Sequence, residues 1–321
     1  MAATPETLLL HTAETSHWVD VDALSKAIRE AIPGIDLRIA RTPPQSRAGI
    51  GTARIVVATD VPADLVEGAD HLGFVQALSA GVDFWDLDPL RERGIALATA
   101  AGVHAEAIAE QVLGYLLAFE RGIHTGIRQQ ERRSWEWYHG GEIREKTVGI
   151  VGVGAIGTRV AEYAQAFDMR VIGTKRDTDA VPDAVDEIYD PADLFEILPE
   201  SDYLVVACPL TPETRQVIDR EAIGALPDHA VVVNIARGEI VEEAALVRAL
   251  QQRKIRGAGL DVYATEPLPR DSPLWDLSNV IMTPHMGGTT PRKPTRTAAV
   301  FAQNYEAFVE GNPDGYVNRV F

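Results

Sequence analysis

The chain has 321 residues, 46% of them hydrophobic, which is enough for two globular domains with cores of their own. A net charge of −17 argues against nucleic acid and anionic membranes as partners, because both are bound through basic surfaces. The single cysteine excludes an internal disulfide framework, and the eight histidines show no metal-ligand spacing. No apolar run approaches the roughly 20 residues of a membrane span, and the first residues do not resemble a signal peptide. We therefore expect a metal-free, cytoplasmic protein.

The basic residues are almost all arginine, since only five of the 30 are lysine. Many carboxylates with few lysines favour a surface adapted to high salt, where charge repulsion is screened. A GC-rich genome would also favour arginine, aspartate and alanine over lysine. The composition leaves both explanations open and slightly favours the first, a halophilic protein.

The N-terminal third alternates between short apolar runs and helical patterns. We expect strands at residues 7–11, 35–41, 53–59, 72–78 and 95–99, with a helix at 21–32. This alternation is typical of a parallel sheet covered by helices on both faces. A long helical pattern at 104–122 then leads out of the region.

A second series of strands and helices begins at Lys146. The expected strands are 147–151, 170–174, 186–189, 203–207, 230–235, 257–262 and 280–283, and the clearest helix is 239–252. A last helix is expected at 293–310, after which 311–321 would rejoin the first region. The resulting fold is α/β: a doubly wound parallel Rossmann sheet inserted into a smaller, flavodoxin-like α/β substrate domain. The substrate domain would hold residues 1–103 and 290–321, and the dinucleotide-binding domain 104–289.

A glycine-rich turn separates the first strand of the second series from its helix. The sequence is Gly152-x-Gly154-Ala155-Ile156-Gly157. In such a turn the first glycine makes the bend, the second lets the backbone approach the phosphates and the third allows close packing of helix and strand. The pyrophosphate of a dinucleotide would lie at the helix N-terminus, where free N–H groups and the helix dipole favour negative charge.

The end of the next strand distinguishes the two nicotinamide cofactors. An acidic residue at this point usually binds the ribose 2′-hydroxyl of NAD. Here the chain has Thr174, Lys175 and Arg176, which would bind the 2′-phosphate of NADP instead. The sequence therefore favours NADP(H). The alternative is that Asp177 turns inward and selects NAD(H).

Polar residues follow three later strands, at the edge where ligands bind in open α/β sheets. They are Arg237, then Asp261 with Glu266, then His285. Reduction of a 2-keto acid needs a proton donor that works near neutral pH, which suits histidine. A neighbouring glutamate would orient the ring and favour its protonated form. Arginine would clamp the substrate carboxylate and polarise the carbonyl.

Each of these residues also has a plain structural explanation. Arg237 could form an ion pair with Glu239 or Glu242 at the start of a helix, and His285 could be a hydrogen-bonded loop residue. For one residue alone the two explanations are equally good. The joint pattern favours the catalytic one.

With these residues the chain resembles the D-isomer-specific 2-hydroxyacid dehydrogenase family over nearly its whole length. The matching segments are Gly152-x-Gly154-x-x-Gly157, Pro209-Leu-Thr-Pro-Glu-Thr214, Asn234-Ile-Ala-Arg-Gly-Glu-Ile-Val241, Gly259-Leu-Asp-Val-x-x-x-Glu-Pro267, Leu274-Trp-Asp-Leu277 and Thr283-Pro-His-x-Gly-Gly288. The resemblance implies an Arg–Glu–His site formed by Arg237, Glu266 and His285. It also implies a homodimer formed through the cofactor domains.

The resemblance extends to ligand contacts. It implies that Asp261 holds the nicotinamide carboxamide and that the backbone at Cys208 and Ala236 contacts the cofactor. Other expected cofactor contacts from the matching segments are Pro209, Thr214, Ile235 and Gly287. The N–H groups of Ala80, Gly81 and Val82, in the loop that begins at Ser79, would bind the substrate carboxylate. The family usually has an acidic or small polar residue where this chain has Lys175.

The predicted function is therefore that of an NADP(H)-preferring D-2-hydroxyacid dehydrogenase that works as a 2-keto acid reductase. Glyoxylate, hydroxypyruvate, pyruvate and longer branched keto acids all remain open as substrates. Formate dehydrogenases of similar sequence carry glutamine beside the histidine, so Glu266 argues against them. Many phosphoglycerate dehydrogenases have a regulatory domain that this chain is too short to hold. A non-enzymatic, dinucleotide-sensing protein of the same fold is the alternative from another class.

Overall fold

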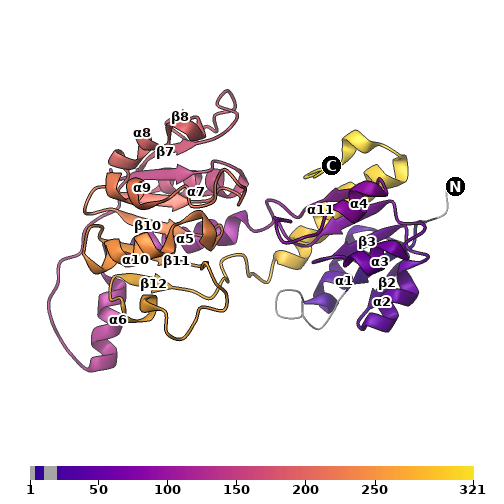
Figure 1. Ribbon diagram of the computed structural model, residues 1–321, viewed down its shortest axis with the longest axis horizontal. Coiled ribbons are helices and arrows are strands. Elements are labelled where there is room, and N and C mark those ends of the chain that lie inside the picture. Colours follow the sequence, from indigo (N-terminus) through magenta and orange to yellow (C-terminus); the bar gives the residue numbers. More distant parts are fainter. Residues whose placement is uncertain (1–3, 11–19) are drawn as a thin grey trace. The chain divides into compact units, whose positions relative to one another are not determined.

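The computed structural model describes residues 4–10 and 20–321, and it divides into two compact units (Figure 1). Unit 1 comprises residues 1–104 and 289–321, and unit 2 comprises 105–288. Each boundary lies one residue from the position expected from the sequence. His11, the last residue of the first expected strand, lies outside the described residues. No described helix is long and apolar enough to cross a membrane.

Unit 1 contains a parallel five-stranded sheet in the order β2-β1-β3-β4-β5. Its strands are β1 (Thr7–Leu10), β2 (Leu37–Ala40), β3 (Ile55–Ala58), β4 (Phe74–Ala77) and β5 (Ala96–Ala98). Its helices are α1 (Val21–Ala31), α2 (Pro43–Ile50), α3 (Ala63–Glu67), α4 (Asp88–Glu92) and α11 (Lys293–Glu310). Successive residues of a strand point to opposite faces, so Leu8 packs with α2 and α3 whereas Leu9 packs with α1 and α11.

The C-terminal segment pairs with strand β5 of the same unit, as expected. The N–H of Thr99 donates to the carbonyl of Asn318, and the N–H of Val320 donates to the carbonyl of Leu97. Helix α11 has the bounds predicted from its pattern. Unit 1 is therefore made of two segments that lie far apart in the sequence.

Unit 2 contains a parallel seven-stranded sheet in the order β12-β11-β10-β9-β6-β7-β8. Its strands are β6 (Thr147–Val151), β7 (Arg170–Thr174), β8 (Glu187–Tyr189), β9 (Tyr203–Val206), β10 (Val231–Asn234), β11 (Gly257–Leu260) and β12 (Val280–Met282). Its α-helices are α5 (Ala105–Glu120), α6 (Ile123–Arg132), α7 (Ala155–Ala166), α8 (Leu194–Ile197), α9 (Arg220–Ala225) and α10 (Glu243–Gln251). Helices α5 and α7 pack on one face, and α8, α9 and α10 on the other. The strand order reverses between β6 and β9, which is where a doubly wound sheet binds its ligand.

One helix differs from the sequence-based expectation. The predicted helix 239–252 is wrong at its start, where a 3₁₀ turn at Gly238–Ile240 is followed by an extended residue, Val241. Val241 forms a bridge with Ile218, whose carbonyl also accepts the N–H of Glu242. This tertiary pairing prevents the helix from starting before Glu243. Apolar periodicity alone does not reveal such a pairing.

Candidate active site

The turn after β6 holds its three glycines in different surroundings. Gly152 has φ of +98°, and a Cβ there would lie 2.6 Å from Cα of Cys208. A Cβ at Gly157 would lie 2.5 Å from the carbonyl oxygen of Gly152. At Gly154, the N-cap of α7, an added Cβ meets no atom within 4 Å. Two glycines therefore serve the turn itself, and the third leaves open space at a helix N-terminus, which fits a dinucleotide pyrophosphate.

The residues after β7 differ in how exposed they are. Thr174 is only 2% exposed, and its hydroxyl accepts the N–H of Gly152 at 3.3 Å. Thr174 therefore holds the glycine turn, and its position does not support the expected contact with a 2′-phosphate. Lys175 is half-buried and donates from Nζ to the carbonyl of Ala180 at 2.5 Å. Arg176 and Asp177 are both exposed.

Arg237 lies in a loop that a buried asparagine closes over the end of β10. Asn234 is 1% exposed; its Nδ2 donates to the carbonyl of Arg237 at 2.9 Å and its Oδ1 accepts the N–H of Ala236 at 3.1 Å. The guanidinium of Arg237 donates from Nη1 to the carbonyl of Ala236 at 2.8 Å. Asn234 at the strand end thus fixes the loop backbone, and the carbonyl of Ala236 holds the guanidinium end of the arginine side chain.

The next residue, Gly238, is in close contact with the loop that follows β11. A Cβ at Gly238 would lie 1.9 Å from the carbonyl carbon of Tyr263 and 2.3 Å from the N atom of Ala264. Both are backbone atoms, which cannot move aside as a side-chain end can. The absence of a side chain at Gly238 therefore lets the Arg237 loop lie directly against the loop that carries Glu266.

Glu266 contacts both its own loop and the histidine. Its Oε1 accepts the N–H of Tyr263 at 3.0 Å, and its Oε2 lies 2.7 Å from Nδ1 of His285. Burial alone would raise the pKa of the Glu266 carboxyl. The hydrogen bonds from His285 and Tyr263, together with the charges of His285 and Arg237, hold that pKa below its ordinary value. The three residues predicted to form the site are thus brought together within unit 2.

The loop of His285 is held by the carboxylate of Asp261, which is 3% exposed. Oδ1 accepts the N–H of Met286 at 2.9 Å and the hydroxyl of Thr283 at 2.5 Å, and Oδ2 accepts the N–H of Gly287 at 2.8 Å. His285 has φ of +49°, an unusual conformation for a non-glycine residue, and its N–H donates to the carbonyl of Asp261 at 2.8 Å. These bonds fix the position of the imidazole.

The remaining predicted cofactor residues lie after β9 and β10. Cys208 is buried, and burial raises the pKa of its thiol to about 11, so the thiol is neutral. The hydroxyl of Thr214 donates to the carbonyl of Pro209 at 2.7 Å and accepts the N–H of Thr211 at 2.7 Å. These two bonds close the loop 209–214. Ile235 is buried at the end of β10, next to the half-buried Ala236.

The predicted carboxylate-binding loop follows β4 in unit 1. Within the described residues, the N–H groups of Ala80, Gly81 and Val82 donate no hydrogen bond. The neighbouring hydroxyl of Ser79 is buried and has no partner there either. Consecutive N–H groups without an internal acceptor can bind an anion.

Comparison with known proteins decides the family. Residues 113–287, more than half of the chain, match the model of the D-isomer specific 2-hydroxyacid dehydrogenase NAD-binding domain. The chain is also 34% identical over 280 residues to glyoxylate/hydroxypyruvate reductase B of Pectobacterium atrosepticum, covering 84% of this chain and 86% of the relative. The chain belongs to the D-isomer-specific 2-hydroxyacid dehydrogenase family.

Relatives in the family differ in length and in name. D-3-phosphoglycerate dehydrogenase of Methanocaldococcus jannaschii is 35% identical over 258 residues, which is 79% of this chain but 48% of the relative. The chain thus spans about half the length of the phosphoglycerate dehydrogenases that it matches. Glyoxylate reductase of Pyrococcus furiosus is 35% identical over 80% of this chain and 79% of its own length.

Solved structures of the family share the fold. A D-isomer specific 2-hydroxyacid dehydrogenase from Xanthobacter autotrophicus, in complex with NADPH and MES, superposes with a TM-score of 0.83 at 30% identity, covering 99% of this chain and 98% of the other. An NADPH-dependent glyoxylate/hydroxypyruvate reductase from Sinorhizobium meliloti, in complex with NADP and sulfate, has a TM-score of 0.82 at 25% identity and covers 98% of both chains.

The motifs did not reveal the residues that support the histidine loop from helix α5. The hydroxyl of Thr283 donates to Asp261, so it accepts hydrogen bonds from Gln111 at 3.2 Å and from Tyr115, whose hydroxyl lies 2.5 Å away. The hydroxyl of Tyr263 donates to the carbonyl of Thr283 at 3.0 Å. Gln111 and Tyr115 lie about half the chain away from Thr283, and a local pattern carries no signal for such a contact.

Proposed function

We propose that the chain is an NADP(H)-preferring D-2-hydroxyacid dehydrogenase that works as a reductase of short 2-keto acids. The observation that carries this proposal is the contact of 2.7 Å between Nδ1 of His285 and Oε2 of Glu266, with the charge of Arg237 acting on the same carboxylate. A proton donor, its orienting base and a cation for the substrate carboxylate are the groups that the reduction requires.

His285 is the acid in the reducing direction. Glu266 accepts the Nδ1 proton, which leaves Nε2 to donate to the keto oxygen. The bound dinucleotide would supply the hydride to the keto carbon, so the substrate gains one hydride and one proton and becomes the hydroxy acid. In the oxidative direction the neutral imidazole takes the same proton back.

Arg237 is proposed to bind the substrate carboxylate and to polarise the carbonyl. A guanidinium can form two parallel hydrogen bonds with a carboxylate, which fixes the orientation of the acid. The N–H groups of Ala80, Gly81 and Val82, which lack acceptors among the described residues, would bind the same carboxylate. The expected contact of Asp261 with the nicotinamide carboxamide completes the proposed site.

The dinucleotide is proposed to bind at the glycine turn, with Lys175 and Arg176 near the adenosine ribose. Two structural neighbours are described with NADPH or NADP bound, which supports a nicotinamide cofactor but not a preference. Arg176 also lowers the pKa of Glu213 through its charge, after the larger effects of hydrogen bonds from Thr211 and from the Glu213 backbone. The charge of Arg176 thus acts on a residue of the loop 209–214, which also carries the expected cofactor contacts Pro209 and Thr214.

The cofactor preference is tested with two opposite variants. Replacing Lys175 and Arg176 by glutamine removes the cations, so the ratio of kcat/KM for NADPH to that for NADH should fall at least about tenfold. Asp177→Asn should leave the ratio unchanged or raise it. If the wild type prefers NADH and Asp177→Asn loses that preference, the residue that binds the ribose is Asp177, and not Lys175 or Arg176.

Glyoxylate and hydroxypyruvate are the proposed substrates, because the relatives covered over more than three quarters of their length carry those names. The initial rate of NADPH oxidation with glyoxylate, hydroxypyruvate, pyruvate and 2-ketoisovalerate would test this, with chiral analysis of the product. We expect the D-hydroxy acid where the product is chiral. Cofactor binding without turnover on any of the four acids would favour the dinucleotide sensor.

A homodimer formed through unit 2 is also proposed, and exposed apolar side chains support it. Trp135 is 88% exposed and Trp137 is 92% exposed, and Ile127 on α6 is also exposed. Large exposed aromatic side chains are characteristic of protein interfaces. Sedimentation of the wild type and of Trp135→Ser/Trp137→Ser tests the proposal; we expect a dimer that the double variant dissociates.

A further inference from the structure

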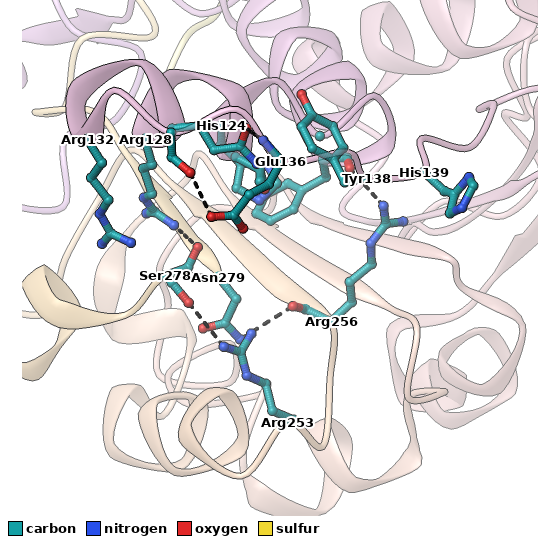
Figure 2. Close-up of a pocket in the computed structure, with 15 residues that line it drawn as sticks. His124, Arg128, Arg132, Glu136, Tyr138, His139, Arg253, Arg256, Ser278 and Asn279 are labelled. Atoms are coloured by element: carbon teal, nitrogen blue, oxygen red, sulfur yellow. Dashed lines mark hydrogen bonds between the residues drawn. The ribbon is translucent and has the colours of Figure 1, made fainter.

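A cavity of about 480 Å³ lies in unit 2, between helix α6, the segment that follows it and the edge of the sheet at β12 (Figure 2). Its basic lining residues are His124, Arg128, Arg132, His139, Arg253 and Arg256. Glu136 is its one acidic lining residue among those described. Four arginines and one carboxylate line the cavity. Its local charge is therefore positive, whereas the net charge of the chain is −17.

Three of these arginines have no acidic partner. No described carboxylate lies within 4.0 Å of the guanidinium of Arg128, Arg132 or Arg253, although the chain has 47 acidic residues against 30 basic ones. The described structure shows no ion pair between Glu136 and these arginines, and the Glu136 carboxylate accepts the hydroxyl of Ser134 at 2.6 Å. Uncompensated cations in an acidic protein are a feature that a bound anion would explain.

Backbone carbonyls and a serine hold two of the guanidinium groups in place. Arg128 donates to the carbonyls of Ser278 and of Val280, the latter at 3.2 Å, and Arg253 donates to the hydroxyl of Ser278 at 3.0 Å. Figure 2 shows these side chains converging on Ser278 from α6 and from the opposite side. A guanidinium has five N–H donors, so these contacts leave donors for a ligand.

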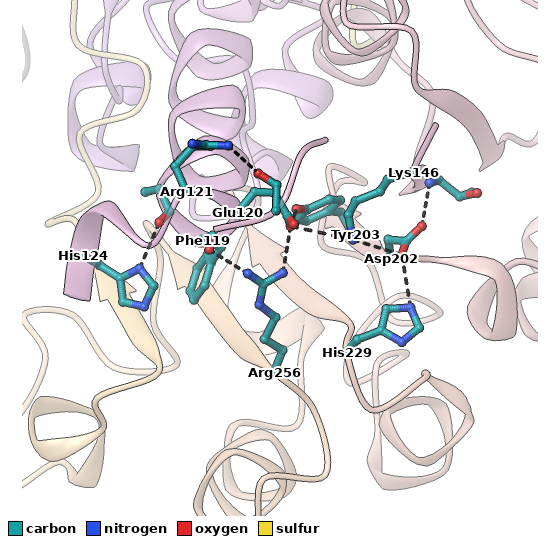
Figure 3. Close-up of polar contacts among 12 residues, drawn as sticks. Phe119, Glu120, Arg121, His124, Lys146, Asp202, Tyr203, His229 and Arg256 are labelled. Atoms are coloured by element: carbon teal, nitrogen blue, oxygen red, sulfur yellow. Dashed lines mark hydrogen bonds and ion pairs between the residues drawn. The ribbon is translucent and has the colours of Figure 1, made fainter. Parts of the chain in front are cut away.

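The fourth arginine belongs to a separate ion-pair network (Figure 3). Arg256 donates to Oε2 of the buried Glu120 at 2.7 Å, and the hydroxyl of Tyr203 donates to the same oxygen at 2.5 Å. Lys146 lies 3.7 Å from that oxygen. Arg256 is therefore neutralised, and the excess positive charge of the cavity comes from Arg128, Arg132 and Arg253.

We propose that this cavity binds a small polyanion, a molecule with two or more phosphate or carboxylate groups, at a site separate from that of Arg237, Glu266 and His285. The volume suits such a ligand, since small-molecule sites typically span about 300–1,000 Å³. Arg132 supplies an exposed guanidinium group, and Arg128 and Arg253 supply guanidinium groups that hydrogen bonds hold in place. All the residues that line the cavity belong to one chain, and Ile127, Trp135 and Trp137, which support the proposed dimer, are not among them. The proposal does not rest on the proposed activity.

His124 provides an internal reporter of the bound anion. Burial lowers the pKa of its imidazole, and the charges of Arg128 and Arg256 lower it further, against the opposing hydrogen bond to the carbonyl of Ala118. A bound polyanion would offset those charges and raise the pKa of His124. The ring resonances of His124 in an NMR titration with pH would therefore shift when the anion is added.

The test is calorimetric titration of the full chain with inorganic pyrophosphate, and separately with citrate, at low ionic strength and with saturating NADPH. NADPH fills the glycine turn, so anion binding there does not contribute. We expect one pyrophosphate per chain, bound at least about tenfold more weakly by Arg132→Gln/Arg253→Gln. The matched control, Lys26→Gln/Arg47→Gln, removes two exposed cations of unit 1 and should bind as the wild type does.

Three outcomes would overturn the proposal. One is no binding of either anion by the wild type, and another is equal binding by the wild type and Arg132→Gln/Arg253→Gln. The third is a wild-type dimer that binds no anion and that the same double variant dissociates, because the cavity would then hold part of a second copy. Binding of pyrophosphate but not of citrate would identify a phosphate site, and binding of citrate but not of pyrophosphate would identify a carboxylate site. Either result supports the proposal.

Discussion

The backbone of Tyr263 occupies the place where a side chain at Gly238 would lie, with 1.9 Å between the added Cβ and the Tyr263 carbonyl carbon. This contact fixes the distance between two loops: one carries Arg237, and the other carries Glu266. The geometry of the proposed site therefore depends on a residue that has no functional group of its own.

Gly238→Ala should separate the two loops. We expect a loss of stability of about 1–3 kcal/mol from overpacking and a fall in kcat/KM of about a hundredfold, because the site depends on accurate placement of its groups. Steady-state kinetics and thermal denaturation measure both effects. Gly224→Ala is the control: it lies in α9 with no atom within 4 Å of the added Cβ, so it should keep full activity. Equal activity of both variants would mean that the loop contact is unimportant.

The glycine turn allows folding to be separated from cofactor binding. Gly157→Ala places a Cβ 2.5 Å from the carbonyl oxygen of Gly152, so we expect it to destabilise the fold by about 1–3 kcal/mol. Gly154→Ala adds a methyl group in open space, so its stability should change by about 0.5 kcal/mol or less. NADPH should nevertheless bind at least about tenfold more weakly to Gly154→Ala, since the methyl group lies where the pyrophosphate approaches. Fluorescence titration would measure the affinity for NADPH. An unchanged affinity would show that the pyrophosphate does not bind beside Gly154.

Glu120 predicts a pH dependence of stability. Burial alone would raise the pKa of its carboxyl, but hydrogen bonds from Tyr203 and Arg256 and the charges of Arg256 and Lys146 hold that pKa below the ordinary value. A depressed pKa in the folded state contributes stability above the unfolded pKa, and this contribution disappears as the pH falls through the folded pKa. Glu120→Gln should therefore cost roughly 3 kcal/mol at neutral pH.

The pH series provides the check on that interpretation. The difference in Tm between the wild type and Glu120→Gln should stay constant from neutral pH to about pH 5 and shrink below it, as the wild-type carboxyl takes up its proton. Glu306→Gln, on helix α11 of unit 1, is a control whose Tm should follow the wild type at every pH. A difference that stays constant with pH would show that shape, not charge, stabilises this network.

Much of the fold follows from local sequence. The strands of unit 2 are continuous apolar runs because both faces of the parallel sheet are buried. For this reason the predicted bounds of the strand Thr147–Val151 agree with the observed ones. Helix α6 was not predicted, because it has only two large apolar side chains, Ile123 and Ile127, and both are exposed. The predicted start of the helix at 239–252 is wrong because the bridge between Val241 and Ile218 is a tertiary contact, which local sequence does not reveal.

The site shows the same division between local and distant information. His285, Glu266 and Arg237 could be proposed because each follows a recognisable strand, and the carboxyl ends of parallel strands share one edge of the sheet. The position of Thr174 could not be foreseen, since its hydroxyl turns inward to the N–H of Gly152. The arginine cavity was missed altogether because its members come from segments more than 100 residues apart and share no motif.

The role of His285 as the proton donor, oriented by Glu266, can be tested in a single turnover. Single-turnover reduction of glyoxylate by bound NADPH would be followed in the wild type and in His285→Gln, with the Kd of NADPH measured for each. We expect the variant to bind NADPH as the wild type does and to lose about a hundredfold to ten-thousandfold in rate, the contribution of a positioned general acid. Near-normal turnover in His285→Gln would contradict the assignment of the proton donor and the proposed mechanism with it.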